Sequence, residues 1–207
     1  MSLGSPAPLR YVALGDSYTI GTATRSAAER WPDQLVARLR AASPSLDLVA
    51  NLGVNGFTSR DVIEVELPEL PALEPGFVTV LVGVNDIVQG VPEATYRENV
   101  TIVLDELLNR LPPSRLLVVT TPDYTVTPRG GDYGDPTQQA EEIGRFNTAI
   151  AELASERGIS VVDIHDLSLE AAADRALVAD DGLHPSGAQY ARWVDRIAPV
   201  VQDLLGS

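Results

Sequence analysis

The sequence predicts an α/β protein, a three-layer α/β/α sandwich built on a parallel sheet of about five strands. Short apolar runs rich in β-branched residues alternate with longer amphipathic stretches along the whole chain. Strands that are apolar at nearly every position are typical of parallel sheets covered by helices on both faces. No internal repeat and no Gly/Ser-rich linker divides the 207 residues, so a single domain is expected.

The strands are predicted where short runs of Val, Leu and Ile stand between turn-forming residues. In chain order they are Leu9–Leu14, Leu46–Asn51, Val78–Val82, Leu116–Thr120 and Ile159–Ile164. Stretches with apolar residues three or four positions apart predict the helices. These helices cover Pro32–Ala42, Arg60–Glu66, Thr95–Leu111, Thr137–Arg157 and Gly187–Leu205. Because strands and helices alternate, we expect parallel strands joined by right-handed helical crossovers.

Two segments lie outside this alternation. Residues 1–8 are expected to be a tag or a disordered N-terminus, and residues 9–207 to form the single domain. Pro122–Pro136, between the fourth strand and its helix, is rich in Gly, Pro, Asp and Tyr. Loops of this length inside a compact domain are usually functional or mobile. Tyr124 and Tyr133 in this loop are therefore either the lining of a substrate pocket or exposed loop residues.

The composition excludes several classes of protein and site. Hydrophobic residues make up 44% of the chain and charged residues 21%, near the globular average, so a folded protein is expected. The chain has 0 cysteines, which excludes disulfides, thiolate metal sites and a cysteine nucleophile. All 15 basic residues are arginine, which excludes Schiff-base chemistry and a P-loop lysine. No convincing motif for a metal or an organic cofactor is present.

Charge and hydropathy limit the partners. A net charge of −14 and a pI of about 4.4 argue against nucleic acid or an anionic membrane as a partner. No apolar run approaches the roughly 18 residues that a membrane-spanning helix needs, so stable membrane insertion is not expected. The first residues lack the charged and apolar regions of a signal peptide. We therefore expect a cytoplasmic protein, or a secreted one if a leader has been removed.

Polar residues gather where the predicted strands end. Ligands of open parallel sheets bind beyond the carboxyl ends of the strands. Ser17 follows the first strand and Gly15, Gly53 follows the second strand, and Asn85 follows the third. Ser17 is either a nucleophile or, more commonly for such a residue, a turn serine bonded to its own backbone. Gly53 and Asn85 are either turn formers or hydrogen-bond donors to a ligand oxygen.

His184 is one of 2 histidines and lies shortly before the last predicted helix. Histidine is the most frequent base near neutral pH. Asp181, three residues earlier, is close enough to accept a hydrogen bond from the ring and leave the other ring nitrogen free. Asp180 is the alternative partner, and acidic residues before a helix are favourable even without a catalytic role. His165, at the end of the fifth strand, is expected to be structural.

Together, four short motifs resemble those of the SGNH hydrolases, also called the GDSL esterase/lipase family. They are Gly15-Asp16-Ser17-Tyr18, Gly53, Gly83-Val84-Asn85-Asp86 and Asp181-Gly182-Leu183-His184. They follow successive predicted strands in the order that the family shows, over essentially the whole domain. Tyr18 stands where the family name implies leucine, and Asn55, close after Gly53, is a second residue of the same turn that could supply a backbone N–H.

The resemblance implies a flavodoxin-like α/β/α fold and the hydrolysis of a small-molecule carboxylic ester without metal or cofactor. Ser17 would attack the acyl carbon, His184 would take its proton, and Asp181 would orient His184. The oxyanion hole would consist of the N–H groups of Ser17 and Gly53 and of the Asn85 side chain. Together these residues describe a serine esterase or lipase.

Two alternatives remain open. A deacetylase of an acetyl-xylan-like or other glycan would use the same machinery, and a non-catalytic flavodoxin-like binding domain would use the fold without the chemistry. Other residues near the motifs are expected to have structural roles. Asp16 and Asp86 are expected to brace the turns of the site through hydrogen bonds, and Trp31 and Trp193 to pack in the core.

Overall fold

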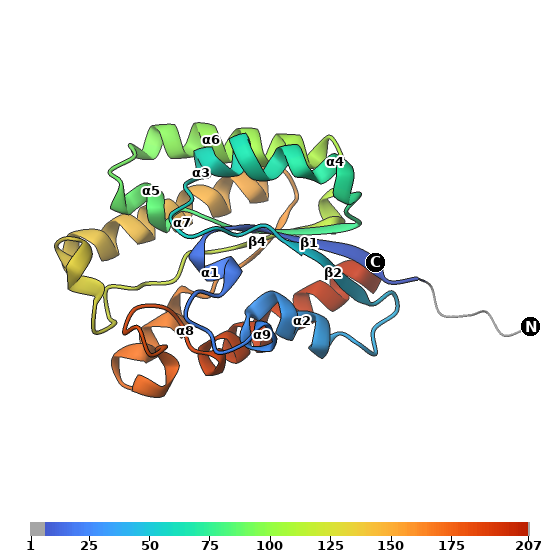
Figure 1. The fold of residues 1–207 in the computed structure, drawn as a ribbon. Helices are drawn as coiled ribbons and strands as arrows, with labels where there is room; N and C mark the ends of the chain where they lie inside the picture. Colours follow the sequence, from blue (N-terminus) through green and yellow to red (C-terminus); the bar gives the residue numbers. More distant parts are fainter. Residues whose placement is uncertain (1–6, 207) are drawn as a thin grey trace, which may run out of the picture.

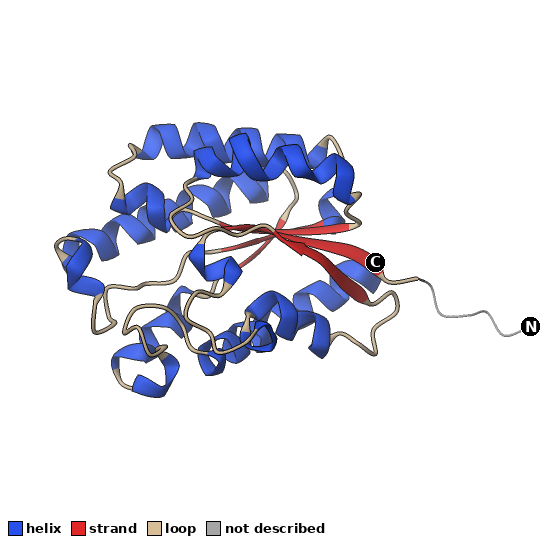
Figure 2. Ribbon diagram, in the orientation of Figure 1, coloured by secondary structure: helices blue, strands red, loops and turns tan. Residues whose placement is uncertain are grey.

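The computed structural model describes residues 7–206, so most of the segment 1–8 lies outside the described residues. A sheet of parallel strands lies between two layers of helices (Figures 1 and 2). The strands are β1 (Leu9–Gly15), β2 (Leu46–Asn51), β3 (Phe77–Leu81), β4 (Leu116–Val119) and β5 (Ser160–Val162). They form one 5-stranded sheet in the order β2-β1-β3-β4-β5, and every neighbouring pair is parallel. The predicted three-layer α/β/α fold is confirmed.

The helices cover both faces of the sheet (Figure 1). One face carries α3 (Ser59–Asp61), α4 (Leu70–Leu73), α6 (Glu93–Leu108) and α7 (Pro136–Glu156). The other face carries α2 (Trp31–Arg38), α8 (His165–Leu169) and α9 (Gly187–Gly206). The short helices α1 (Ser17–Ile20) and α5 (Val84–Val88) follow β1 and β3 directly. Both therefore begin at the carboxyl edge of the sheet.

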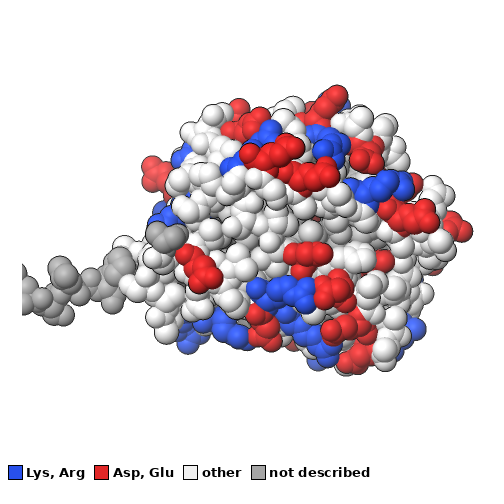
Figure 3. Space-filling view, turned by 180° about the vertical axis from the view of Figure 1, so that it is seen from behind, with Lys and Arg blue, Asp and Glu red and all other residues white. Residues whose placement is uncertain are grey.

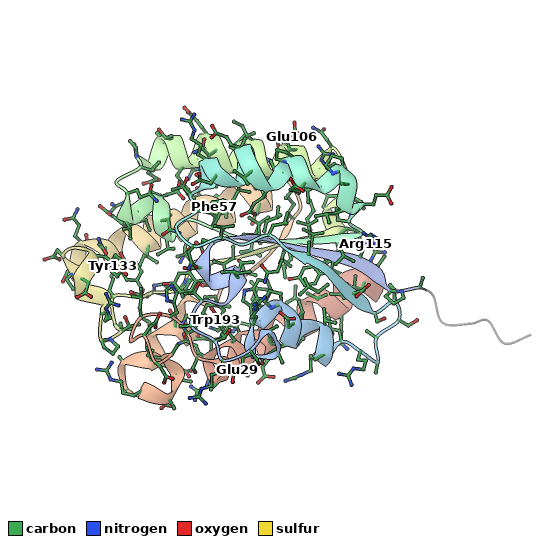
Figure 4. All side chains as sticks on the ribbon, in the orientation of Figure 1. Glu29, Phe57, Glu106, Arg115, Tyr133 and Trp193 are labelled. Carbon is green, nitrogen blue, oxygen red and sulfur yellow. The ribbon has the colours of Figure 1, made fainter. Side chains whose placement is uncertain are left out.

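The core lies on both sides of the central strands. Every residue of β3 and β4 is buried, as expected for strands covered on both faces. Trp31 and Trp193 are fully buried, which confirms their predicted place in the core, and Figure 4 shows Trp193 beneath the sheet. Among the central strands, Tyr11 and Thr79 form a buried hydrogen bond of 2.8 Å between their hydroxyl groups.

The helix predicted over Arg60–Glu66 extends much further. It begins at a capping box formed by Thr58 and Asp61, continues through a π-helical segment, Val62–Glu66, and ends at Leu73. Prolines normally interrupt an α-helix because they lack a backbone N–H. Here Pro68 and Pro71 stand in first-turn positions of successive short segments, where no N–H is needed. The helix thus continues past both prolines because its hydrogen bonding changes from π-helical to 3-10 to α-helical along this stretch.

The surface mixes acidic and basic side chains. On the face shown in Figure 3, arginines lie among aspartates and glutamates. Several arginines form ion pairs between elements, including Arg38 with Asp195 and Arg196 with Asp166. Among residues 7–206, no helix combines the length and the apolar character needed to cross a bilayer.

Candidate active site

The sheet brings two of the predicted residues to the point where its strand order reverses. β1 lies beside β3, and the remaining strands extend from this pair in opposite directions, β2 on one side and β4 on the other. Ser17 begins α1 directly after β1, and Asn85 lies in α5 directly after β3. Ligands of open α/β sheets bind in the crevice at such a point. The fold therefore places Ser17 and Asn85 where a ligand is expected.

The turn that carries Ser17 requires glycine at its start. Gly15 has a φ of +143°, and a Cβ there would lie 2.0 Å from the carbonyl oxygen of Leu81. Asp16 caps α1, since its Oδ1 accepts a hydrogen bond of 2.9 Å from the Tyr18 N–H. Asp16 thus braces the turn, as expected. Ser17 follows it with 7% of its surface exposed.

His184 is held by the loop in which it lies. Its carbonyl oxygen accepts a 2.8 Å hydrogen bond from the Ala179 N–H. Oδ1 of Asp181 accepts hydrogen bonds from the N–H groups of Leu183 (2.9 Å) and His184 (3.0 Å). Oδ2 of Asp181 lies 2.5 Å from Nδ1 of the His184 ring. With Nδ1 donating to this carboxylate, Nε2 is the ring nitrogen that can accept a proton.

The charge of Asp181 is stabilised by these contacts. Burial raises its pKa, but the hydrogen bonds from the His184 ring and from the two backbone N–H groups together lower it by more. The net result is a pKa below the ordinary value, so Asp181 is ionised at neutral pH. Asp180, the alternative partner, lines a separate cavity with Arg175 and Ser186.

Ser17, Asn85 and His184 line one cavity of about 190 Å³. Its other lining residues are Tyr18, Asn55, Gly56, Val84, Val88, Tyr124, Tyr133 and Leu183. Tyr124 and Tyr133 come from the segment 122–136, and their rings form a T-shaped pair with centroids 5.9 Å apart. Tyr133 is 37% exposed, and Figure 4 shows it near the edge of the molecule. Of the two interpretations of these tyrosines, the structure supports pocket lining.

Asn85 is fixed by one of its two amide hydrogens. Its Nδ2 donates a 2.9 Å hydrogen bond to the carbonyl oxygen of Phe57, on the loop after β2 (Figure 4). The neighbouring Asp86 is fully buried and accepts hydrogen bonds from the Ser59 N–H (2.8 Å) and hydroxyl (2.5 Å). Burial raises the pKa of Asp86, although these hydrogen bonds oppose the increase. Asp86 thus ties α5 to α3, as expected.

Gly53 is the one predicted oxyanion-hole residue that does not line this cavity. Its N–H donates a 3.2 Å hydrogen bond to Oδ1 of Asn51. A Cβ at position 53 would lie 2.7 Å from the Ile20 nitrogen, so this glycine allows the turn to pack closely against α1. Gly56, three residues later, does line the cavity, with a φ of +84°. The sequence signal for it is the pair Asn55-Gly56, a common turn sequence.

Tyr18 makes a contact that the sequence did not predict. It is buried, and its ring centroid lies 5.7 Å from that of His184 and 6.4 Å from that of Trp193. The residue that replaces leucine in the first motif therefore supports the imidazole. His165 does not line the cavity of Ser17 and His184, and its Nε2 lies 3.7 Å from the buried Asp123 carboxylate, which fits its expected structural role.

Solved structures share this fold. A protein described as lipolytic and of the G-D-S-L family, from Desulfitobacterium hafniense DCB-2, has a TM-score of 0.73 at 21% identity, covering 93% of this chain and 99% of its own. The lipase/acylhydrolase from Enterococcus faecalis has a TM-score of 0.73 at 19% identity, covering 94% and 96%. An acetylxylan esterase from Geobacillus stearothermophilus has a TM-score of 0.71 at 19% identity, covering 99% and 97%. At these identities the likeness establishes the fold.

The family is established by the sequence. No curated protein matches the chain. The profile of the GDSL-like lipase/acylhydrolase family, by contrast, matches residues 13–192, which is most of the chain. The matched stretch runs from β1 into α9 and includes Ser17, Asn85 and His184. The protein therefore belongs to the GDSL-like lipase/acylhydrolase family and is a carboxylic ester hydrolase.

Proposed function

We propose that the protein is a serine esterase that hydrolyses small carboxylic esters through Ser17, His184 and Asp181. The observation that carries this proposal is the position of the His184 ring. Its Nδ1 is bound to Asp181 at 2.5 Å, and the residue lines the same cavity as Ser17. Nε2 is then the base for the Ser17 hydroxyl.

The reaction proceeds through an acyl-enzyme. Oγ of Ser17 attacks the acyl carbon while Nε2 of His184 takes the hydroxyl proton, and the ionised Asp181 stabilises the imidazolium. The proton then passes to the leaving alcohol as the ester C–O bond breaks. In the second half, His184 takes a proton from water as the water oxygen attacks the acyl carbon. His184 then returns the proton to Oγ of Ser17 as the acyl–Oγ bond breaks and the acid leaves.

Three donors are proposed for the oxyanion of the tetrahedral intermediate. They are the Ser17 N–H at the start of α1, the amide hydrogen of Asn85 that is not bonded to the backbone, and the Gly56 N–H. We assign the third donor to Gly56, and not to Gly53, because Gly56 lines the cavity and the Gly53 N–H is already hydrogen-bonded. Preorganised donors of this kind stabilise the charge that develops in the transition state.

The cavity favours a small acyl group. Its volume of about 190 Å³ is below the roughly 300–1,000 Å³ of pockets that hold drug-sized ligands. Val84, Val88, Tyr124 and Tyr133 supply mostly apolar and aromatic walls. An acyl chain of a few carbons therefore fits better than a long fatty acyl chain, and the proposed partner is a small-molecule ester.

Deacetylation of a glycan is the second candidate. An acetyl group is the smallest common acyl group and suits a cavity of about 190 Å³. One solved structure of the same fold is described as an acetyl-xylooligosaccharide esterase, from a Geobacillus species, with a TM-score of 0.70. In this case the leaving alcohol would be a sugar hydroxyl, and the roles of Ser17, His184 and Asp181 would be unchanged.

Initial rates on p-nitrophenyl esters from C2 to C12, measured for wild type and Ser17→Ala, test the proposal. Acetate release from acetylated xylo-oligosaccharides is measured in parallel. Turnover of short esters that disappears in Ser17→Ala supports the esterase, and much faster acetate release supports the deacetylase. Activity that persists in Ser17→Ala contradicts the triad. No turnover of any substrate, together with no labelling by a serine-directed phosphonate, would instead favour the non-catalytic binding domain.

The choice between the two glycines has its own test. A phosphonate bound to Ser17 places a negatively charged oxygen where the oxyanion forms. We expect the amide proton of Gly56 to move strongly downfield in the ¹⁵N-HSQC spectrum of the labelled protein, while that of Gly53 changes little. The reverse pattern would assign the donor to Gly53.

A further inference from the structure

Two buried carboxyl groups hold the turn that carries Ser17. Oε2 of Glu66 accepts a 2.9 Å hydrogen bond from the Gly15 N–H, just before the turn. Oδ1 of Asp16 accepts a 2.9 Å hydrogen bond from the Tyr18 N–H, just after Ser17. Glu66 is 1% exposed and Asp16 is 0% exposed. The backbone on both sides of Ser17 is therefore tied to a carboxyl group inside the protein.

The second oxygen of each carboxyl group is unusual. Oδ2 of Asp16 and Oε1 of Glu66 are buried and have no hydrogen-bond partner within residues 7–206. A buried carboxylate without a compensating partner is strongly unfavourable, because it has lost its hydration. A carboxylic acid avoids this cost, since it carries no charge and its hydroxyl can itself donate.

Among residues 7–206, the titratable groups around this pair add negative charge and no positive charge. The titratable groups that face it are Asp61 on α3, Asp86 on α5, Tyr18 on α1, Tyr96 on α6 and Tyr190 on α9. All of them are acidic or phenolic. Burial, together with the nearby Asp16 and Asp61, raises the pKa of Glu66 to about 9. Burial and the nearby Asp86 raise the pKa of Asp16 to about 8.

The helix geometry selects Glu66 for this position. It is the last residue of the π-helical segment Val62–Glu66, where the Leu67 N–H bonds to the Val62 carbonyl oxygen. Glu64 and Glu69 in the same region are exposed, whereas Glu66 is buried against β1. Isolated π-helical turns inside helices occur frequently at functional sites. Glu66, at the end of this wider turn, is thus the glutamate of the three that contacts the turn carrying Ser17.

We propose that Glu66 and Asp16 both stay protonated at neutral pH and that Glu66 is a positioning residue for Ser17. The neutral Glu66 side chain holds the Gly15 N–H without placing a negative charge beside Asp16. When both protons are lost at alkaline pH, two carboxylates repel each other behind the nucleophile and the turn shifts. The effect on catalysis rests on the proposed role of Ser17, whereas proton retention can be measured without any substrate.

Unfolding by urea from pH 5 to pH 9 tests proton retention in wild type, Glu66→Gln and Glu66→Ala. A pKa raised above the unfolded value of 4.5 means that the folded state binds the extra proton, so wild type loses stability as pH rises toward 9. Glutamine copies the shape of the neutral acid and cannot ionise. We therefore expect Glu66→Gln to gain stability over wild type steadily with pH, and Glu66→Ala to be destabilised throughout.

The pH dependence of kcat tests the positioning role. Glu66→Gln is expected to keep most of the kcat at pH 7 and to hold it to higher pH than wild type. Glu66→Ala is expected to lose on the order of 10²-fold in kcat with little change in KM, because a displaced nucleophile attacks poorly. The exposed Glu64→Gln, in an ion pair with Arg60, is the matched control and should leave both profiles unchanged.

Either of two results overturns the inference. One is a stability difference between Glu66→Gln and wild type that does not change with pH. The other is a loss of folding or of kcat in Glu66→Gln as large as in Glu66→Ala, since a charged carboxylate would then be required. Asp16→Asn, which keeps an oxygen for the Tyr18 N–H, gives an independent second variant with the same expected dependence on pH. Activity that persists in Ser17→Ala would refute only the proposed triad.

Discussion

Nδ1 of His184 lies 2.5 Å from Oδ2 of Asp181, and the other oxygen of this carboxylate accepts the backbone N–H groups of Leu183 and His184. One side chain therefore folds the loop and orients the ring at the same time. The ring is supported from another side by Tyr18, whose centroid is 5.7 Å away. The imidazole is therefore held in one orientation, as its proposed role as a general base requires.

Asp181→Asn is expected to lower kcat by a factor on the order of 10⁴ with little change in KM. Asparagine can still accept the two backbone N–H groups through its oxygen. Its amide hydrogens then face Nδ1, which favours the tautomer that carries the proton on Nε2 and cannot accept one from Ser17. Steady-state kinetics on a short ester measures the loss. Asp180→Asn is the control, and an equal loss in both variants would contradict the assignment.

Asp181 also links folding stability to pH. Its pKa in the folded protein lies below the ordinary value of 3.8, so the unfolded chain takes up the proton first as pH falls. The stabilisation is thus complete above about pH 5 and is lost as pH falls through the folded pKa. Urea unfolding should show a difference between wild type and Asp181→Asn that is largest at neutral pH and shrinks toward pH 3. A difference that grows on acidification would have the wrong sign.

Asn85→Ala is expected to reduce kcat by about 10²–10³, the usual effect of removing one oxyanion-hole donor. The variant also loses the 2.9 Å bond to the Phe57 carbonyl, so its folding is checked by circular dichroism. Asn109→Ala, at an exposed helix end, serves as the control for asparagine removal. Unchanged turnover in a folded Asn85→Ala protein would remove Asn85 from the proposed mechanism.

Ser59→Ala is expected to destabilise the protein by about 1–3 kcal/mol, because it leaves a buried acceptor without its donor. The Ser59 hydroxyl donates to Asp86 at 2.5 Å and accepts from Asn99 at 3.0 Å, and both Ser59 and Asp86 are fully buried. Urea unfolding at neutral pH measures the change. Ser155→Ala, on the exposed side of α7, should change stability little. Equal effects of the two substitutions would show that the buried hydrogen bond contributes nothing specific.

The sheet could be predicted because a strand buried on both faces is apolar at nearly every position. The run predicted as Val78–Val82 is β3, shifted by one residue to Phe77–Leu81. The helices α1, α5 and α8 were not predicted, since four or five residues are too few to show a helical period. For α1 the stabilising contact is the cap formed by Asp16, which depends on the turn already being in place.

The site could be predicted where a local motif carries it. Ser17, Asn85 and His184 each stand in a short motif after a strand or before a helix, and the structure brings all three to one cavity. Gly56 was not selected. Which of Gly53 and Gly56 faces the cavity depends on how the turn packs on α1, and the sequence does not show that packing. Glu66 was not singled out either. Its sequence surroundings match those of exposed glutamates nearby, and only folding buries it.

Tyr133→Ala is expected to shift the preference among esters toward longer acyl chains. The partly exposed ring lines the cavity and packs against Tyr124, whereas the backbone carbonyl of Tyr133 is held by the Gln139 side chain. Removing the ring therefore opens space without releasing the loop. Each added methylene that becomes buried there contributes about 0.8 kcal/mol, or roughly fourfold in kcat/KM relative to the C2 ester.

The measurement is kcat/KM along the C2 to C12 ester series for wild type, Tyr133→Ala and Tyr133→Phe. Phenylalanine keeps the ring in place, so Tyr133→Phe should keep the preference of wild type. A parallel shift in both variants would assign the effect to the hydroxyl group. An unchanged series in Tyr133→Ala would mean that acyl chains leave the cavity by another side, past Val88 on α5, and Val88→Ala would then produce the shift instead.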